Sequence, residues 1–419
     1  MESIILDAPR QGEISSGQIA AALEQLLEGR TLKKVLLLPP DLTRLHSRAG
    51  EITQWLYNRL NGACRMDIMP ALGSHAAMSK EELAMMFGGG IPPDAFLVHD
   101  WRNGLKTIGS VPGGFIREIS GGRLCYDIGV QVNKKLYDGY DLIVSIGQVV
   151  PHEVAGMANH SKNIFIGAGG IGMIHRTHFL GAVCGMEQAL GNDHAPVRQV
   201  LDYAAEHFLG GLPVVYAMTV VKPEDGCDKL KGFYIGDRRD AFEAAVARSR
   251  QENITWLDKP LKTCVCWMEP QEFRSFWLAN KSVYRTRMAM ADGGKLIVLA
   301  PAVDKFGEDP GMDLLLRKYG YKGTEYVLKA VKENDDLGGN LSAAAHLIHG
   351  SSEGRFDIYY AAPKLCREEI ENAGFKYVSF EETSQKYAGL KDGANSVDGE
   401  EVYYISNPAM GLWRVRASG

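Results

Sequence analysis

The sequence predicts an α/β protein built from two α/β domains with mainly parallel sheets and an active-site cleft between them. Short apolar runs alternate with amphipathic stretches along the chain, which is the pattern of strand–helix units. With 419 residues the chain is too long for one compact core. The polar segment 251–262, which contains Pro260, separates two such series and is the candidate linker. Small ligands commonly bind in clefts between domains.

Seven apolar runs are the candidate strands, and they lie at 34–40, 66–72, 141–147, 213–221, 263–268, 295–301 and 356–362. The helical segment 16–29 ends at Gly29, a residue typical of helix C-termini. A second helix follows Ser79, because Glu82 three residues later completes a capping box. Helical periodicity also fits 195–208, 239–251, 274–292 and 324–334.

These elements divide the chain into three parts. Residues 1–257 form the N-terminal α/β domain and carry most of the histidines singled out below. Residues 258–395 form a C-terminal α/β domain that closes the cleft. Residues 396–419 form a tail that we expect to return to the N-terminal domain.

Composition excludes several classes of protein. The net charge of -5 argues against a nucleic-acid binder. No apolar run reaches the roughly 20 residues of a membrane helix, and the N-terminus lacks the pattern of a signal peptide. The seven cysteines are odd in number and scattered, so we expect neither disulfides nor a cysteine metal site. The sequence predicts a soluble cytoplasmic protein.

Two polar motifs each follow a candidate strand, where open α/β sheets bind ligands. In the first, Asp41 is suited to a ribose hydroxyl and Arg44 to a carboxylate or phosphate. Taken alone, this motif is more often an ordinary turn with a surface arginine. In the second, Ser74 is suited to an anion and His75 to proton transfer. Parallel strands deliver both loops to one edge, so each motif strengthens the other.

The segment 151–178 concentrates four histidines, one lysine and several glycines directly after a candidate strand. His152 lies just beyond that strand, Lys162 ten residues later and His178 sixteen beyond that. A lone loop lysine is usually solvated, and a lone histidine often has a structural role. The glycines do not form a clean dinucleotide-binding fingerprint. The density of reactive side chains nevertheless indicates an active site.

In the second domain, Lys281 shares a helix face with Trp277 and is a candidate for binding a carboxylate, although an exposed lysine over an aromatic ring is the commoner arrangement.

The ordered combination of these motifs resembles the nickel-pincer-nucleotide-dependent lactate racemase family. The resemblance rests on DLTR at 41–44, the ALGSH loop, VVPHEVAG at 149–156, and the spacing from His152 to Lys162 and His178. The helix with Lys281 and the segment GGKLIVLAP at 293–301 extend it into the second domain.

The resemblance implies a cofactor, the nickel complex of pyridinium-3,5-bisthiocarboxylic acid mononucleotide. Lys162 would hold it through a covalent thioamide bond, and His178 would be the one protein ligand of the nickel. Asp41, Thr43 and Ser74 would contribute to cofactor binding. Separate cofactor-synthesis enzymes would be needed for maturation.

The resemblance also implies an isomerase that inverts C2 of a small 2-hydroxy acid by reversible hydride transfer through a 2-oxo acid. His75 and His152 would be the acid/base pair on opposite faces of the substrate, as a reversible reaction needs. Arg44 and Lys281 would hold the substrate carboxylate, beside Trp277.

Several residues differ from the family pattern, namely Ala76 after the first catalytic histidine, Asn159 and His160 before Lys162, and Trp277-Leu278 on the second-domain helix. A 2-epimerase of a longer sugar acid (an aldonate), or a racemase of a 2-hydroxy diacid, therefore stays open beside a lactate racemase. Two other classes also stay open. One is a zinc hydrolase with His75, His152 and His178 as ligands, although the usual carboxylate ligand pattern is missing. The other is a non-catalytic nucleotide-binding protein.

Overall fold

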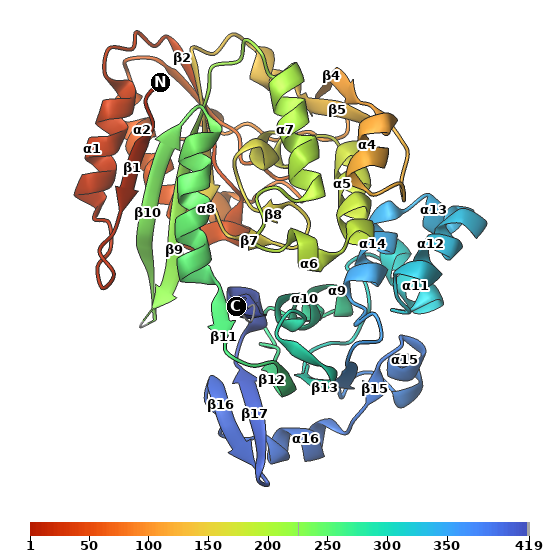
Figure 1. The fold of residues 1–419 in the computed structure, drawn as a ribbon. Helices are drawn as coiled ribbons and strands as arrows, with labels where there is room; N and C mark the ends of the chain where they lie inside the picture. Colours follow the sequence, from red (N-terminus) through yellow and green to blue (C-terminus); the bar gives the residue numbers. More distant parts are fainter. Residues whose placement is uncertain (225, 417–419) are drawn as a thin grey trace. The chain divides into compact units, whose positions relative to one another are not determined.

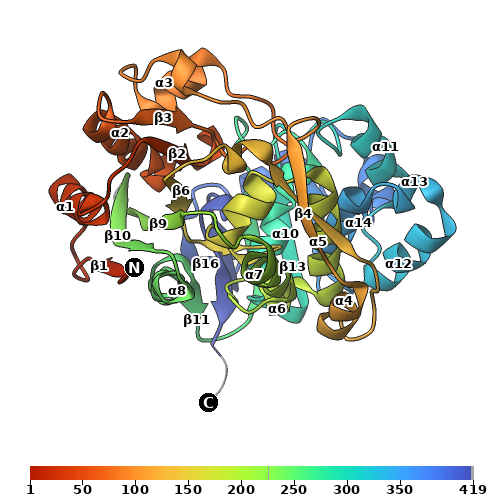
Figure 2. The ribbon, with the colours of Figure 1, turned by 90° about the horizontal axis from the view of Figure 1, so that it is seen from above.

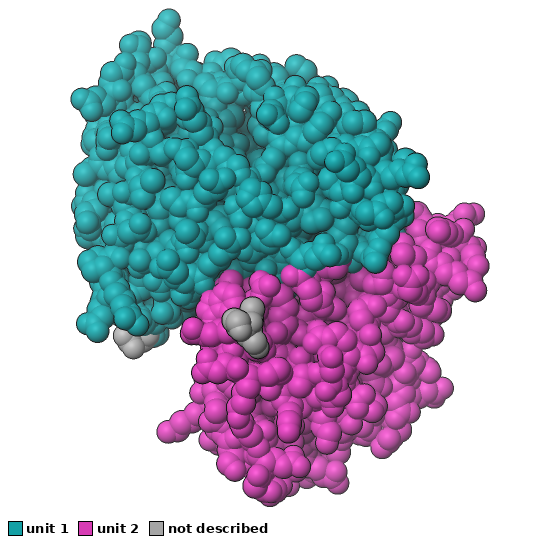
Figure 3. Space-filling model, viewed as in Figure 1, with its two compact units in different colours: residues 1–184, 188–253 teal, residues 185–187, 254–419 magenta. Residues whose placement is uncertain are grey.

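The computed structural model describes residues 1–224 and 226–416 and divides the chain into two compact units, drawn in two colours in Figure 3. The first unit comprises residues 1–184 and 188–253, and the second comprises 185–187 and the chain from 254 onward. The contacts thus divide the chain after residue 253, where the sequence placed the boundary after 257. Each unit contains a six-stranded, mainly parallel sheet with helices, which confirms the predicted fold class.

The sheet of the first unit has the strand order β1-β10-β9-β6-β2-β3. Strands β9, β6, β2 and β3 pair in parallel, whereas β10 pairs antiparallel with both β9 and β1. Every residue of β6 is buried, as expected for a parallel strand covered on both faces. The strands are β1 (Ile4–Asp7), β2 (Lys34–Leu38), β3 (Arg65–Ile68), β6 (Leu142–Gln148), β9 (Val214–Glu224) and β10 (Cys227–Gly236). The four strands predicted in this region are confirmed.

Helices cover both faces of this sheet (Figures 1 and 2). One apolar core lies between the sheet and α1, α2 and α3, and a second lies between the sheet and α5, α7 and α8. The bounds are α1 (Ser16–Leu27), α2 (Ala49–Leu60), α3 (Lys80–Phe87), α4 (Gly113–Ile119), α5 (Ile171–Cys184), α7 (Pro196–Phe208) and α8 (Arg239–Asn253), with the short α6 (Met186–Ala189) at the division between the units. The predicted capping box of Ser79 and Glu82 is present at the start of α3.

Two small hairpins complete the first unit. One pairs β4 (Leu105–Val111) with β5 (Ile128–Asn133), and the other pairs β7 (Pro151–His152) with β8 (Gly156–Met157). The second hairpin contains the predicted acid/base residue His152 and follows β6 after two residues. It turns the chain back sharply, which brings the segment with Lys162 close to the end of the same strand.

The sheet of the second unit has the order β15-β14-β13-β12-β17-β16, and all neighbours except β16 and β17 pair in parallel. Its strands are β12 (Leu261–Trp267), β13 (Met290–Leu299), β14 (Asp357–Ala361), β15 (Lys376–Tyr377), β16 (Gly393–Val397) and β17 (Glu400–Ile405). Its helices are α9 (Phe276–Ala279), α10 (Lys281–Thr286), α11 (Pro310–Tyr319), α12 (Thr324–Glu333), α13 (Asp335–Gly338), α14 (Leu341–His349), α15 (Arg367–Asn372) and α16 (Phe380–Lys386).

Two expectations about the second unit differ from the structure. The tail from 396 was expected to return to the N-terminal domain, but β17 pairs with β12 and β16 within the second unit. A short strand, β18 (Trp413–Val415), pairs with β11 (Thr255–Leu257) in the same unit. The prediction of a single helix at 274–292 is wrong, because the segment forms two short helices, α9 and α10, and β13 then begins at Met290.

Within 1–224 and 226–416, no helix combines the length and apolarity needed to cross a membrane.

Candidate active site

The loops after β2, β3 and β6 meet at one edge of the first unit's sheet, as the sequence led us to expect. Pro40 and Ala71 form a parallel bridge that continues the pairing of β2 and β3 into their loops. The N–H of Gly73 donates to the carbonyl of Gly167 at 2.7 Å, which ties the ALGSH loop to the turn after Lys162. Gly73 has φ +59°, a conformation that glycine adopts without strain.

His75 and Asp41 come from two of these loops and form a close pair. The distance from His75 Nδ1 to Asp41 Oδ2 is 2.6 Å. The other carboxylate oxygen of Asp41 accepts hydrogen bonds from the backbone N–H of Thr43 at 3.2 Å and from the Thr43 hydroxyl. Burial by itself raises the pKa of Asp41, but the hydrogen bonds from His75 and Thr43 outweigh it and hold that pKa below its usual value. Asp41, predicted as a cofactor contact, is thus also the partner of a candidate catalytic base.

The His75 ring itself is largely exposed, at 60% of its side-chain surface, and Ser74 beside it is also exposed. The pair therefore combines a buried, fixed carboxylate with an imidazole that a ligand can reach. This arrangement suits a group that exchanges a proton with a small molecule.

His152 lies half-buried in the β7–β8 hairpin, and its ring is fixed by the turn that follows it. The backbone N–H groups of Val154 and Ala155 donate to His152 Nδ1 at 3.1 and 3.3 Å. Burial lowers the pKa of His152 well below the usual value, Glu153 opposes this shift, and the charges of Lys162 and Arg44 add to it. His152 is therefore neutral at physiological pH.

Lys162 follows a segment held by a buried arginine. Arg198, which has no exposed surface, donates to Ser161 Oγ at 2.9 Å and to the carbonyls of Met157 and Asn159 at 2.5 and 3.3 Å. Burial and, to a smaller extent, the charge of Arg44 together lower the pKa of Lys162 to about 8. A substantial fraction of this amine is thus unprotonated near neutral pH, as a nucleophilic lysine needs.

Asn163, the residue after Lys162, ties this segment to the sheet. Its side-chain amide donates to the carbonyl of Leu38 and to the hydroxyl of Ser145, each at 3.0 Å. Those two acceptors lie in the neighbouring strands β2 and β6. Lys162 is therefore positioned against the strand ends from which Asp41 and His152 follow.

His178 lies on α5, and its ring orientation is fixed from within the helix. His178 Nδ1 donates to the carbonyl of Ile174 at 2.6 Å, because a carbonyl can only accept. Burial lowers the pKa of His178 to about 4, so the ring is neutral and its Nε2 carries a lone pair. A neutral histidine whose other ring nitrogen donates to a carbonyl is a common arrangement for a metal ligand.

The predicted residues of the first unit lie close enough for their charges to shift one another's pKa values. The charge of Lys162 acts on the pKa of both His152 and His178, and Arg44 acts on both His152 and Lys162. Arg44 is half-buried in the 3-10 segment Leu42–Ser47, which Asp41 caps at its N-terminus. The structure thus gathers Arg44, Asp41, His152, Lys162 and His178 in the first unit.

The two predicted residues of the second unit lie on α9 and α10. The helix that was expected to run through both is interrupted at Asn280, so Lys281 opens a new helix. Trp277 stacks on His346 with ring centroids 4.1 Å apart. Lys281 Nζ lies 3.6 Å from a carboxylate oxygen of Glu272 and 5.5 Å from the ring centre of Phe273.

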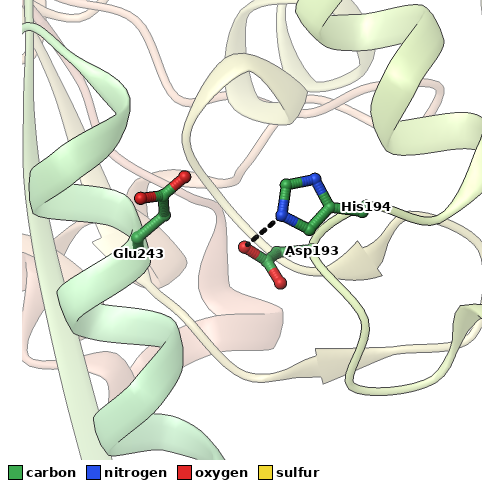
Figure 4. Close-up of side chains that lie close together, drawn as sticks. All are labelled: Asp193, His194 and Glu243. Carbon is green, nitrogen blue, oxygen red and sulfur yellow. Dashed lines mark ion pairs between the residues drawn. The ribbon is translucent and has the colours of Figure 1, made fainter.

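In the described parts of the chain, three metal-capable side chains come within 4.8 Å of one another at one place, formed by Asp193, His194 and Glu243 (Figure 4). Asp193 already forms ion pairs with Arg239 at 3.1 Å and Arg250 at 2.8 Å, which compete with a cation. His194 and Glu243 are exposed. This group is therefore a surface ion-pair network. The three histidines of the zinc-hydrolase alternative, His75, His152 and His178, do not form such a group, which argues against that reading.

Sequence reasoning missed the residues that position the site. Arg198 lies on α7, 36 residues after Lys162, and carried no local signal that would pair it with the lysine segment. Asn163 was overlooked because one amide beside a lysine is uninformative until its acceptors are known. A buried arginine within an otherwise apolar helix face was the one available hint.

Part of the chain matches a known protein domain. Residues 15–191 match the model of the lactate racemase N-terminal domain. This match lies in the N-terminal part of the chain and supports the resemblance found in the sequence. The matched region includes every site residue of that unit from Asp41 to His178.

The chain is also similar to individual proteins. It is 29% identical over 306 residues to a lactate racemase from Thermoanaerobacterium thermosaccharolyticum, covering 68% of this chain and 63% of that protein. The match thus spans less than two thirds of the relative's length. A crystal structure of a Thermotoga maritima protein superposes with a TM-score of 0.81 at 24% identity, covering 98% of this chain and all of that one. The lactate racemase apoprotein of T. thermosaccharolyticum gives a TM-score of 0.72 at 18% identity, covering 99% and 100%. At these identities the structures establish the shared fold.

Proposed function

We propose that this protein is an isomerase that inverts C2 of a 2-hydroxy acid, using a nickel-pincer nucleotide attached to Lys162. The observation that carries the proposal is the pairing of a half-buried lysine, whose pKa is lowered to about 8, with the neutral His178 in the same site. The similarity to lactate racemases supports the reaction class.

The residues present fit this cofactor. His178 keeps its Nε2 lone pair for a metal because Nδ1 is engaged by the Ile174 carbonyl. The unprotonated fraction of Lys162 supplies the nucleophile for a covalent bond. Exposed Ser74 and Thr43 lie on the adjoining loops, where hydroxyls suit the polar groups of a nucleotide. Lys162 and His178 would hold such a cofactor, which would supply a centre able to take up a hydride from C2 of a substrate and give it back.

The protein's own groups bind the substrate and move its proton. The guanidinium of Arg44 holds the carboxylate and limits rotation of the acid. As the C2 hydrogen leaves with its electron pair, one histidine takes the hydroxyl proton, and a flat 2-oxo acid results. The other histidine, in its protonated imidazolium form, would deliver a proton to the carbonyl oxygen as a hydride reaches the opposite face of C2, and the inverted alcohol would result. His75 and His152 are the two histidines, and the overall reaction leaves the substrate neither oxidised nor reduced.

The test begins with the full-length protein produced together with enzymes that synthesise the cofactor. We expect an increase in intact mass for the wild type and none for Lys162→Ala. Chiral chromatography of 2-hydroxy acids after incubation, first lactate, then diacids and aldonates, measures inversion at C2 and identifies the substrate. Inversion of C2 by this protein while Lys162 stays unmodified would contradict the proposal.

Lys281 and Trp277 stay predictions from the sequence, and a second measurement tests the lysine. If Lys281 binds the substrate carboxylate, Lys281→Met raises KM at least about tenfold, since it removes a charged partner. Lys305→Met is a matched control, because Lys305 is a half-exposed lysine of the same unit that also lies near a glutamate, Glu308. An unchanged KM in Lys281→Met excludes the predicted role.

A further inference from the structure

The hydrogen-bond partners of His75 define where its proton lies. Ionised Asp41 can only accept a hydrogen bond, and its lowered pKa keeps it ionised at neutral pH. The contact of 2.6 Å from Oδ2 to Nδ1 therefore requires a hydrogen on His75 Nδ1. In the neutral ring, Nε2 is then the unprotonated nitrogen. Thr43 fixes the carboxylate by donating to Oδ1, so this choice is built into the fold.

The partners of His152 define the opposite state. A backbone N–H can only donate, and both Val154 and Ala155 donate to His152 Nδ1. Nδ1 therefore carries the lone pair, and the hydrogen of the neutral ring lies on Nε2. The groups whose charge acts on this ring are Glu153, Lys162, Arg44 and His178, and burial dominates over all of them.

We propose that the two histidines are held in opposite tautomers, with His75 presenting an acceptor at Nε2 and His152 presenting a donor at Nε2. Asp41 and the turn amides of Val154 and Ala155 are the positioning groups. The consequence for catalysis rests on the proposed function. The resting site then contains one ready base, His75, and one ready hydrogen-bond donor, His152.

Because of this asymmetry, the two configurations of the substrate place different demands on the two histidines. One configuration offers its hydroxyl proton to His75, which accepts it at Nε2 without a change of tautomer. His152 can then deliver a proton only after its Nδ1 has been protonated, because loss of the Nε2 hydrogen from the neutral ring would leave an imidazolate. The other requires His152 to act as the base through Nε2, which needs a hydrogen on Nδ1 and so breaks the contacts with the Val154 and Ala155 amides. We infer that proton redistribution, rather than hydride transfer alone, separates consecutive turnovers of opposite direction.

Ring nitrogen NMR tests the tautomers directly in the full-length protein labelled with ¹⁵N-histidine. In long-range ¹H–¹⁵N correlation spectra, protonated and unprotonated ring nitrogens resonate in separate regions. His75→Gln and His152→Gln identify the two sets of signals by their loss. We expect an unprotonated Nε2 for His75 and an unprotonated Nδ1 for His152, measured at pH 8. The same tautomer in both rings, or averaged shifts in either, would overturn the inference.

Asp41→Asn supplies the matched variant. Thr43 donates to Oδ1, so the asparagine keeps its oxygen there and presents its NH2 to His75 Nδ1. We expect the His75 tautomer to switch and the His152 signals to stay, with kcat falling by about 10²-fold or more. An unchanged His75 tautomer would contradict the assigned role of Asp41. The spectra need neither cofactor nor substrate, so opposite tautomers in a protein that shows no racemase activity even after it is loaded with the cofactor would refute the proposed function alone.

Discussion

Arg198 donates a hydrogen bond to the hydroxyl of Ser161 at 2.9 Å, one residue before Lys162. The same guanidinium binds two carbonyls of the preceding segment, and Ser161 in turn donates to Asp202 at 3.1 Å. One buried cation therefore replaces the regular backbone pairing that this irregular segment lacks. Since Asn159 and His160 both have positive φ, the segment depends on these contacts to keep its shape.

Replacing Arg198 tests that dependence. Arg198→Met keeps the length of the side chain but removes the donors, so the Met157 and Asn159 carbonyls lose a charged partner. We expect stability to fall by about 3 kcal/mol, measured as a lower midpoint of urea unfolding. Arg198→Lys retains the charge without the forked geometry and should recover only part of the loss. An unchanged unfolding midpoint in Arg198→Met would show that the segment before Lys162 keeps its conformation without these hydrogen bonds.

Much of the fold follows from the sequence for a simple reason. Strands buried on both faces, such as β6 and β2, and the buried end of β13 at Leu296–Leu299 are continuous apolar runs in the sequence and are therefore easy to detect. Strand β10 was missed because its first residues, CDKL, are mostly polar and its pairing partner β9 supplies the stabilisation. Helix α5 was missed because its apolar residues surround it on nearly all sides and leave no period to detect. The prediction of a helix at 274–292 failed at its end because local periodicity does not reveal the pairing of Met290 with Leu261 of β12, where β13 begins.

The sequence suggested which residues belong to the candidate site, but it could not predict the contacts between them. Strand-end position alone indicated that Asp41, His75 and His152 approach one edge. The pairing of Asp41 with His75 crosses 34 residues, and no local pattern encodes it. The amides that fix His152 likewise depend on the turn conformation rather than on the identity of Val154 and Ala155.

Gly156 lets the His152 hairpin close against a neighbouring loop. Its φ is +75°, and a Cβ there would lie 1.8 Å from the carbonyl oxygen of Asn192. We expect Gly156→Ala to lower stability by about 3 kcal/mol or more, measured by urea unfolding. Gly172→Ala is the control, because that position lies in α5 with open space around it, and it should be neutral or stabilising by about 0.5–1 kcal/mol. Equal midpoints for the two variants would contradict the steric argument.

We expect His160 to lower the stability of the protein in acid. Its ring is stacked between Tyr216 and Phe242 at 4.1 and 4.8 Å, and neither ring nitrogen has a hydrogen-bond partner. Burial lowers its pKa well below the usual value, so the unfolded chain binds a proton that the folded chain does not. The free energy of unfolding therefore does not depend on His160 above about pH 6.5, and it decreases progressively as the pH falls below that value, because protonation of His160 favours the unfolded chain.

His160→Phe removes that proton site while it keeps the ring stack. We expect the urea midpoint at pH 7.5 to stay the same or rise, and its decrease between pH 7.5 and 5.5 to become smaller. His207→Phe is the control, since His207 also stacks on a tyrosine but at the surface, and should leave the decrease unchanged. An undiminished decrease in His160→Phe would assign the acid sensitivity to other groups.

His178 and His175 lie on the same helix, and the proposed function gives them different roles. His178→Ala removes the one protein ligand, so nickel content of the cofactor-loaded protein should fall by about tenfold or more, measured by elemental analysis. The mass increase on Lys162 should persist, because the covalent bond does not involve His178. His175→Ala should retain both nickel and the mass increase. Loss of nickel in His175→Ala but not in His178→Ala would mean that His175, and not His178, is the nickel ligand.

The reactivity of Lys162 tests the electrostatics of the site without the cofactor. Burial and the charge of Arg44 lower its pKa to about 8, so the reactive, unprotonated amine increases from pH 7 to 9 and then levels off. Acylation followed by peptide mass spectrometry should give a rate profile for Lys162 with its midpoint near pH 8. Lys318, whose pKa is raised by its hydrogen bond to Asp336, should keep gaining reactivity above pH 9. Arg44→Met removes a neighbouring positive charge and should move the Lys162 profile to higher pH, since the protonated amine then meets less repulsion. Parallel profiles for Lys162 and Lys318 would mean that the lysine is an ordinary surface amine, and the site would then lack the nucleophile that covalent attachment requires.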